Sequence, residues 1–279
     1  MTYSECVRTL STVCPEKTEA EAEARILLCS LFGLSGAQLA AGGHDKDYSS
    51  PVLDKALARR LDRVPLAYII GEQPFWKFDF IVTEDCLIPR QETEILVETA
   101  VSSLPAGRFL DLCTGSGCIA VSILCERADL TGAAADISCK ALDVCRQNAE
   151  RMHVADRLSV LHGNALTAEG IREAGPFDGL VCNPPYIETD TIPTLSPEVL
   201  HEPREALDGG PDGLDFYRAI LETSPAYLKK TAPLLFEIGW NQGKDLAALA
   251  AGHGYECRVI RDLGGRDRVA HLYSDVQTL

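Results

Sequence analysis

The chain contains no Cys-x-x-Cys pair, although 11 of its 279 residues are cysteines. Paired cysteines at that spacing are typical of zinc sites and redox motifs, so we expect no metal site. The cysteine count is odd and the chain is long, which disfavours the disulfide framework of a small secreted protein. We therefore expect free thiols and a cytoplasmic location.

Long apolar runs are also missing, and the first residues lack the basic start and apolar stretch of a signal peptide. We therefore expect neither secretion nor a membrane span. The chain has fewer basic than acidic residues, and its formal net charge is -15. Because proteins that bind duplex nucleic acid set Lys and Arg against phosphates, this charge makes direct nucleic acid binding an unfavoured function. Solubility explains the acidity more simply.

The residues that are present divide the chain into three predicted parts. Residues 1–64 carry apolar side chains at helical spacing with glycine breaks, which predicts a small helical N-terminal domain. Residues 65–89 turn to aromatic and β-branched residues, including Tyr-Ile-Ile-Gly at 68–71 and the run 75–82, which predicts a β-hairpin linker. Residues 90–279 alternate helices with short apolar strands.

The third part predicts an α/β fold. A helix is expected near residues 92–102, and strands near 108–113, 132–136, 158–162, 177–182, 233–238, 257–260 and 269–273. Such alternation predicts a mainly parallel seven-stranded sheet with helices on both faces.

The most informative motif is Asn183-Pro184-Pro185-Tyr186, which directly follows the expected strand 177–182. The side-chain oxygen of Asn183 and the carbonyl of Pro184 can each accept a hydrogen from an NH2 group, and Tyr186 offers a ring face to a planar group. The motif favours methyl transfer to an amide or amino nitrogen. An ordinary turn after a strand is the alternative.

A second motif, Asp-Leu-Cys-Thr-Gly-Ser-Gly at residues 111–117, leads from an expected strand into a helix that begins near Ser116. Glycines at such a turn let a ligand approach the backbone. With Ala120 in the third place, the spacing also satisfies the loose dinucleotide fingerprint, so NAD stays open as a ligand. Asp136 ends the next strand, where its carboxylate could hold ribose hydroxyls or instead cap the following helix.

These motifs resemble those of the release factor glutamine methyltransferase family. The resemblance extends to Pro-Leu-Ala-Tyr-Ile-Ile-Gly-Glu at 65–72, Leu-Ile-Pro-Arg-Gln-Glu-Thr-Glu at 87–94, Glu-Pro at 202–203 and Gly-Gly-Pro-Asp-Gly-Leu at 209–214. It continues with Glu-Ile-Gly at 237–239 and Asp-Leu-x-Gly-Arg-Asp-Arg at 262–268. It covers most of the chain.

The resemblance implies an N-terminal substrate-docking domain, a hairpin linker and a methyltransferase domain that binds S-adenosylmethionine. The implied substrate is the glutamine of the Gly-Gly-Gln motif of peptide chain release factors. The residues expected to bind the cofactor are Asp111, Cys113, Thr114, Gly115, Ser116, Gly117, Asp136, Asn164, Ala165 and Asn183. The expected catalytic residues are Asn183, Pro184 and Tyr186, and the substrate is expected to contact Asn183, Pro184, Pro185, Tyr186 and Arg90.

Two positions depart from the family pattern. Cys113 stands where the family usually has glycine, and Asn164-Ala165 stands where an acidic residue and an aromatic one are expected near the adenine. Both departures concern cofactor affinity rather than reaction type. Arg90 has its own alternative, a salt bridge to Glu92 or Glu94.

Three other functions stay open at this point. A glutamine methyltransferase of a large-subunit ribosomal protein would use the same chemistry. An adenine amino-methyltransferase uses a similar loop, although the acidity of the chain and the lack of room for a target-recognition domain argue against it. A noncatalytic binding module could keep the fold. The sequence leaves open which release factors are preferred, the oligomeric state and the role of the acidic surface.

Overall fold

The computed structural model describes residues 1–274, which form two compact units. One unit comprises Met1–Glu72 together with Ser196–His201, and the other comprises Gln73–Leu195 and the chain from Glu202. The predicted domain boundaries after residues 64 and 89 stay predictions.

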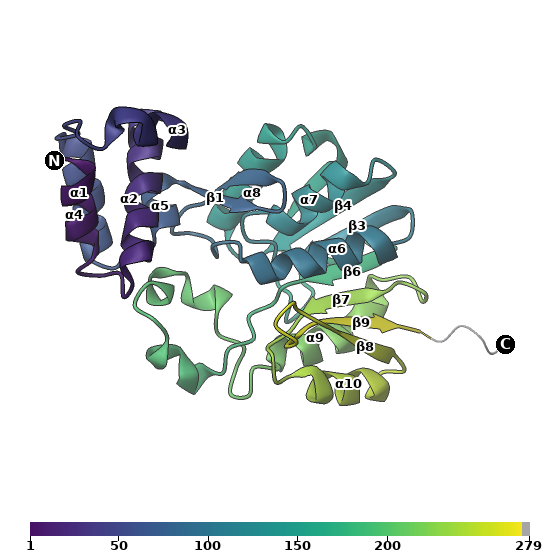
Figure 1. Ribbon diagram of the computed structural model, residues 1–279. Helices are drawn as coiled ribbons and strands as arrows, with labels where there is room; N and C mark the ends of the chain where they lie inside the picture. Colours follow the sequence, from purple (N-terminus) through teal and green to yellow (C-terminus); the bar gives the residue numbers. More distant parts are fainter. Residues whose placement is uncertain (275–279) are drawn as a thin grey trace. The chain divides into compact units, whose positions relative to one another are not determined.

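The first unit is helical. Its helices are α1 (Tyr3–Leu10), α2 (Lys17–Phe32), α3 (Gly36–Gln38), α4 (Pro51–Leu61) and α5 (Leu66–Ile70) (Figure 1). Leu10, Leu27 and Leu53 are fully buried in a shared core. Arg60 is also buried, and its guanidinium pairs with Glu23 at 2.8 Å and with Glu198 at 3.0 Å. The ion pair between Arg60 and Glu198 attaches the segment Ser196–His201, which is distant in sequence, to the helices.

The interpretation of residues 68–71 as part of the hairpin is wrong, because Leu66–Ile70 is the helix α5. Pro65 is its N-cap, and Gly71 ends it in the left-handed conformation with φ 87°. The hairpin itself consists of β1 (Glu72–Phe75) and β2 (Phe78–Ile81). A short apolar run fits a helix or a strand equally well, and here proline and glycine at its ends decide for the helix.

No single helix within residues 1–274 is both long and apolar enough to cross a membrane. The bent pair Lys17–Phe32 and Gly36–Gly43 would meet that requirement together, by length and composition alone.

The second unit contains a seven-stranded sheet, as predicted. Its strands are β3 (Gly107–Leu112), β4 (Leu130–Asp136), β5 (Leu158–His162), β6 (Gly179–Cys182), β7 (Leu234–Glu237), β8 (Glu256–Arg261) and β9 (Asp267–Tyr273). Their spatial order is β5-β4-β3-β6-β7-β9-β8. The first five are parallel, whereas β9 runs antiparallel to both β7 and β8.

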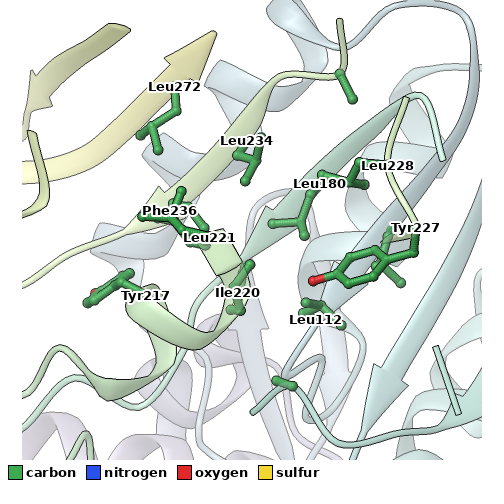
Figure 2. Packing of buried hydrophobic residues seen from close by; sticks show 14 of the residues in the cluster. Leu112, Leu180, Tyr217, Ile220, Leu221, Tyr227, Leu228, Leu234, Phe236 and Leu272 are labelled. Carbon is green, nitrogen blue, oxygen red and sulfur yellow. The ribbon is translucent and has the colours of Figure 1, made fainter. Parts of the chain in front are cut away.

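Helices cover both faces of this sheet. On one face pack α6 (Glu94–Ser103), α7 (Cys118–Glu126) and α8 (Cys139–Arg151), and on the other pack α9 (Asp215–Thr223) and α10 (Gly243–Gly252). Successive strand residues alternate between the two cores, so that Leu180 faces α9 while Val181 faces α6 and α7. Figure 2 shows the core on the face that α9 and α10 cover, where Leu180, Leu234 and Phe236 meet Tyr217 and Ile220.

The strand order reverses direction between β3 and β6. From β3 the chain continues outward to β4 and β5, whereas β6 returns to the other side of β3 and continues to β7. Loops that leave neighbouring parallel strands in opposite directions open a crevice at their carboxyl ends. The loops after β3, β4 and β6 are the ones that carry the predicted motifs.

Candidate active site

A cavity of about 320 Å³ lies at this carboxyl edge. Four loops that follow parallel strands contribute to its wall. The lining residues include Cys113 and Gly115 after β3, Asp136 to Ser138 at the end of β4, Gly163 to Leu166 after β5, and Asn183 and Pro185 after β6. The fold therefore brings the two main sequence motifs and Asp136 to one cavity.

The loop after β3 uses left-handed backbone at three positions. Gly115 has φ 55° and Gly117, the N-cap of α7, has φ 80°. A Cβ at Gly117 would come within 2.6 Å of the sulfur of Cys145. Both the left-handed backbone and the lack of space therefore require glycine at this position. Cys113 also has φ 56°, a conformation that costs energy for a residue with a side chain.

Asp111 is fully buried beside this loop. Its Oδ2 accepts hydrogen bonds from the hydroxyl of Thr114 at 2.6 Å and from the N–H of Ala120 at 3.2 Å. Its Oδ1 has no hydrogen-bond partner within residues 1–274. Burial raises the pKa of Asp111 to about 7, against the opposing effect of these hydrogen bonds. Asp111 is not among the residues that line the cavity, so this unpartnered oxygen lies behind the loop rather than in the cavity wall.

Asp136 ties the loops after β3 and β4 together. Its two carboxylate oxygens accept the N–H groups of Gly115 and Ser138, each at 2.9 Å. The N-cap of α8 is Ser138, whose hydroxyl accepts the N–H of Ala141. The alternative that Asp136 caps this helix is therefore wrong. Its carboxylate lines the cavity, and burial raises its pKa.

The loop after β6 lies on the opposite side of the switch point. Asn183 and Pro185 line the cavity, and the side-chain nitrogen of Asn183 donates to the hydroxyl of Thr93 at 3.4 Å. Pro184 is buried and is not among the lining residues. The hydroxyl of Tyr186 donates to Glu237 at 3.2 Å. Burial, and then the charge of Glu237, raise the pKa of Tyr186 well above its usual value.

Arg90 forms an ion pair with Glu202, not with Glu92 or Glu94 as the alternative interpretation held. Glu202 is buried and also accepts the N–H of Ile88 at 3.0 Å. The carboxylate thus fastens the segment before α6 to the chain after β6. Glu94 is already engaged, because it accepts the N–H of Trp76 at 2.8 Å.

Asn164 and Ala165, for which the resemblance implies a place near the adenine, follow β5 and line the cavity. The Asn164 side-chain oxygen accepts the N–H of Leu166 at 2.8 Å and so shapes its own turn. Sequence reasoning missed the apolar wall residues Ile137 and Leu166, which are 52% and 42% exposed. Each stands within two residues of a predicted cavity residue, and this adjacency was the available signal.

The residues of the cavity wall fit a ligand that has both an apolar ring and polar groups. Ile137 and Leu166 offer apolar surface to a flat ring, and the Asp136 carboxylate can accept hydrogen bonds from hydroxyl groups. The glycine loop allows close backbone approach. A flat ring and hydroxyl groups occur together in S-adenosylmethionine.

Comparison with known proteins matches two parts of the chain to family models. Residues 6–71 match the PrmC N-terminal domain, and residues 91–212 match the methyltransferase small domain. A release factor glutamine methyltransferase from Cereibacter sphaeroides is 42% identical over 257 residues, which cover 90% of each chain. A protein of the same name from Caulobacter vibrioides is 38% identical and covers 88% of this chain and 87% of its own.

Among solved structures, a methyltransferase from Pyrococcus furiosus aligns with a TM-score of 0.53 at 16% identity, over 72% of this chain and 91% of its own. At that identity the likeness concerns the fold alone. The sequence relatives are far closer and extend over nearly the whole chain. The chain belongs to the release factor glutamine methyltransferase family.

Proposed function

We propose that this protein transfers a methyl group from S-adenosylmethionine to the side-chain amide nitrogen of the Gly-Gly-Gln glutamine of peptide chain release factors. The observation that carries the proposal is Asn183, whose amide lines the cavity at the sheet's switch point. The names of the two relatives support the choice of substrate. We assign the reaction to the cytoplasm and substrate docking to the helical N-terminal domain.

The cofactor is held by the loops after β3, β4 and β5. The left-handed turn from Cys113 to Gly117, with the buried Asp111 behind it, would hold the amino-acid end, and Asp136 in the cavity wall would hold the ribose hydroxyls. The adenine would be held near Asn164 and Ala165, where Ile137 and Leu166 would supply the apolar contact that the family pattern assigns to an aromatic residue. When bound, S-adenosylmethionine supplies an activated methyl group on a sulfonium.

The substrate amide is held by the loop after β6. The Asn183 side-chain oxygen and the Pro184 carbonyl accept one N–H hydrogen each, which turns the nitrogen lone pair toward the cofactor. Pro185 closes the wall beside it, and Tyr186 stands behind the loop through its bond to Glu237. Arg90 is held by Glu202 near this segment and can still bind a substrate carbonyl with its remaining donors.

The first prediction concerns the target. Labelled methyl from S-adenosylmethionine should enter purified release factor, and replacing the Gly-Gly-Gln glutamine should abolish the label. Ribosomal protein and nucleic acid serve as parallel substrates. Label in either of these, with an unlabelled release factor, would refute the proposed substrate.

The second prediction concerns Asn183. Asn183→Ala should lower kcat by about 10²- to 10³-fold, since it removes an acceptor that orients the reacting nitrogen. Cofactor affinity, measured by calorimetry, should change much less. Gln147→Ala is the matched control, because it truncates an exposed amide on α8. Equal turnover of the two variants would show that Asn183 has no such role.

The third prediction concerns Cys113. Cys113→Gly should raise stability by up to about 1 kcal/mol, because glycine adopts φ 56° without a Cβ penalty. It should also tighten cofactor binding, because it removes a side chain from the cavity wall. His153→Gly is the control, since His153 has φ 57° and does not line the cavity. Tighter binding in both variants would argue against the steric explanation.

The fourth prediction concerns the buried charge of Asp111. Its folded pKa of about 7 lies above the unfolded value of roughly 3.9, so the folded protein keeps a proton that the unfolded chain loses. The free energy of unfolding therefore decreases as pH rises from the unfolded pKa to the folded pKa of Asp111. In chemical denaturation without cofactor, Asp111→Asn should gain stability relative to the wild type between about pH 5 and about pH 8.

The control for Asp111 is Asp178→Asn. Burial raises the pKa of Asp178, but hydrogen bonds from Lys229 and from the N–H of Arg108 outweigh it and leave that pKa lowered. The difference in free energy of unfolding between Asp178→Asn and the wild type should stay constant over the same pH range. The reason is that the Asp178 carboxyl is ionised there in both the folded and the unfolded protein. A flat difference for Asp111→Asn as well would contradict the assigned pKa.

A further inference from the structure

Gln242 is a buried amide to which the reaction described above gives no role. It is 6% exposed and stands at the N-cap position of α10, where a short polar side chain usually accepts an N–H of the first helical turn. The Gln242 side chain makes no such hydrogen bond to α10. A buried amide is costly unless its donors and its acceptor find partners, so the contacts of Gln242 show which part of the fold it serves.

The Gln242 amide joins the backbone of three separate segments. Its Oε1 accepts the N–H of Gly239, which ends the Glu-Ile-Gly motif after β7, at 2.8 Å. Its Nε2 donates to the carbonyl of Tyr186 at 3.1 Å and to the carbonyl of Gly213, just before α9, also at 3.1 Å. A backbone N–H can only donate and a backbone carbonyl can only accept, so these partners fix the orientation of the amide. Gln242 therefore holds the end of the loop after β6, which is Tyr186.

The chain before α9 also contacts the residue that follows this loop. Ile187 donates its N–H to the Leu207 carbonyl at 3.0 Å, and its own carbonyl accepts the N–H of Gly209 at 2.8 Å. Gly213 belongs to the same segment, and its carbonyl accepts the second N–H of Gln242. The side chain of Gln242 therefore extends a contact between two segments that their backbones already make.

Gly213 adopts the left-handed conformation, with φ 71°. A Cβ there would overlap the Tyr186 carbonyl oxygen and would come within 2.7 Å of the Gln242 Nε2. Both the backbone conformation and the lack of space therefore require glycine where Gln242 joins the two segments. The Gly-Gly-Pro-Asp-Gly-Leu motif at 209–214 and the Glu-Ile-Gly motif at 237–239 thus meet at one side chain.

The loop after β6 can donate few backbone hydrogen bonds of its own, because Pro184 and Pro185 have no N–H. The sheet holds the start of the loop, since Cys182 of β6 pairs with Phe236 of β7. The end of the loop is held through the Tyr186 carbonyl. Because the proline rings restrict φ, the loop is stiff, and a shift of the Tyr186 carbonyl is passed on to the Pro184 carbonyl.

We propose that Gln242 is a positioning residue for methyl transfer. By holding the Tyr186 carbonyl, it sets where the two substrate acceptors of the loop stand, which are the Asn183 side-chain oxygen and the Pro184 carbonyl. The inference rests on the proposed function, because only a substrate amide gives these acceptors their role. A misplacement of about 1 Å at reacting groups can cost about 10²-fold in rate. Gln242 does not line the cavity, so its effect falls on turnover and not on cofactor binding.

The test uses Gln242→Met, which keeps the length of the side chain and removes its donors and its acceptor. Asn148→Leu is the matched control, because Asn148 is a fully buried amide of α8 with the same set of backbone partners. It accepts the N–H of Ile81 at 2.8 Å and donates to the carbonyls of Ile81 and Ser116, at 3.0 and 2.9 Å. The two substitutions therefore leave equivalent groups without partners, and the midpoints of thermal unfolding should fall by similar amounts.

Turnover should separate the two variants. With labelled methyl, release factor and saturating S-adenosylmethionine, Gln242→Met should lower kcat by about 10- to 10²-fold. Its cofactor Kd, measured by calorimetry, should stay within about threefold of the wild-type value, and so should the kcat of Asn148→Leu. Equal losses of kcat in the two variants would overturn the proposal, because turnover would then follow stability alone.

Gln242→Glu supplies a second variant, which has the shape of the wild-type side chain. Whether ionised or protonated, its carboxyl group still accepts the Gly239 N–H but can donate to at most one of the two carbonyls. It should therefore also lower kcat at an unchanged cofactor Kd, and a Gln242→Glu enzyme as active as the wild type would contradict the positioning role.

A double variant tests whether Gln242 acts through the loop. Combined with Asn183→Ala, Gln242→Met should cost less kcat than it does alone, because one of the two acceptors that it positions is already missing. Losses that multiply in full would argue against this route. A wild-type protein that does not label release factor would refute the proposed function itself, whereas labelling by a fully active Gln242→Met enzyme would refute only the role of Gln242.

Discussion

Strands that are covered by helices on both faces can place charged groups only at their ends, and the candidate site depends on this constraint. Three acidic residues stand at or next to the carboxyl ends of β3, β4 and β7: Asp111, Asp136 and Glu237. Asp111 and Glu237 are fully buried, whereas Asp136 is half-buried in the cavity wall, and each accepts hydrogen bonds from loop residues. Asp111 holds the loop after β3, Asp136 joins that loop to the start of α8, and Glu237 stands behind the loop after β6. Hydrogen bonds to these three carboxylates therefore hold the loops in place.

The parts that sequence reasoning found share one property, which is that each motif directly follows an apolar strand. The glycine turn, Asp136 and Asn183 could be assigned to one edge because parallel strands end on the same side. The partner of Arg90 could not be found in this way. Glu202 is 112 residues away, and nearby Glu92 and Glu94 offered the simpler choice. The contact of Asn183 with Thr93 was equally hidden, since 90 residues separate the two in the sequence.

The two departures from the family pattern have different physical consequences. Cys113 keeps the left-handed backbone that glycine would adopt freely, so the loop retains its shape at a cost in conformational energy. Asn164 and Ala165 retain their place in the cavity wall, but neither offers an aromatic face. Ile137 and Leu166 supply apolar area without the geometry of ring stacking. In the proposed cofactor site, apolar contact from Ile137 and Leu166 therefore takes the place of aromatic stacking.

The same acids bear on how an amide nitrogen can be methylated without a strong base. Tyr186 keeps its proton, because burial and the charge of Glu237 both raise its pKa. Glu237 is occupied by Tyr186 and stands behind the loop rather than in the cavity wall. Neither group is available to remove a proton before the carbon–nitrogen bond forms. A nitrogen that has gained a methyl group is far more acidic than the neutral amide, so water suffices to take its proton afterwards. What the proposed mechanism requires of the protein is orientation before the transfer, and the acceptors assigned to Asn183 and Pro184 would supply it.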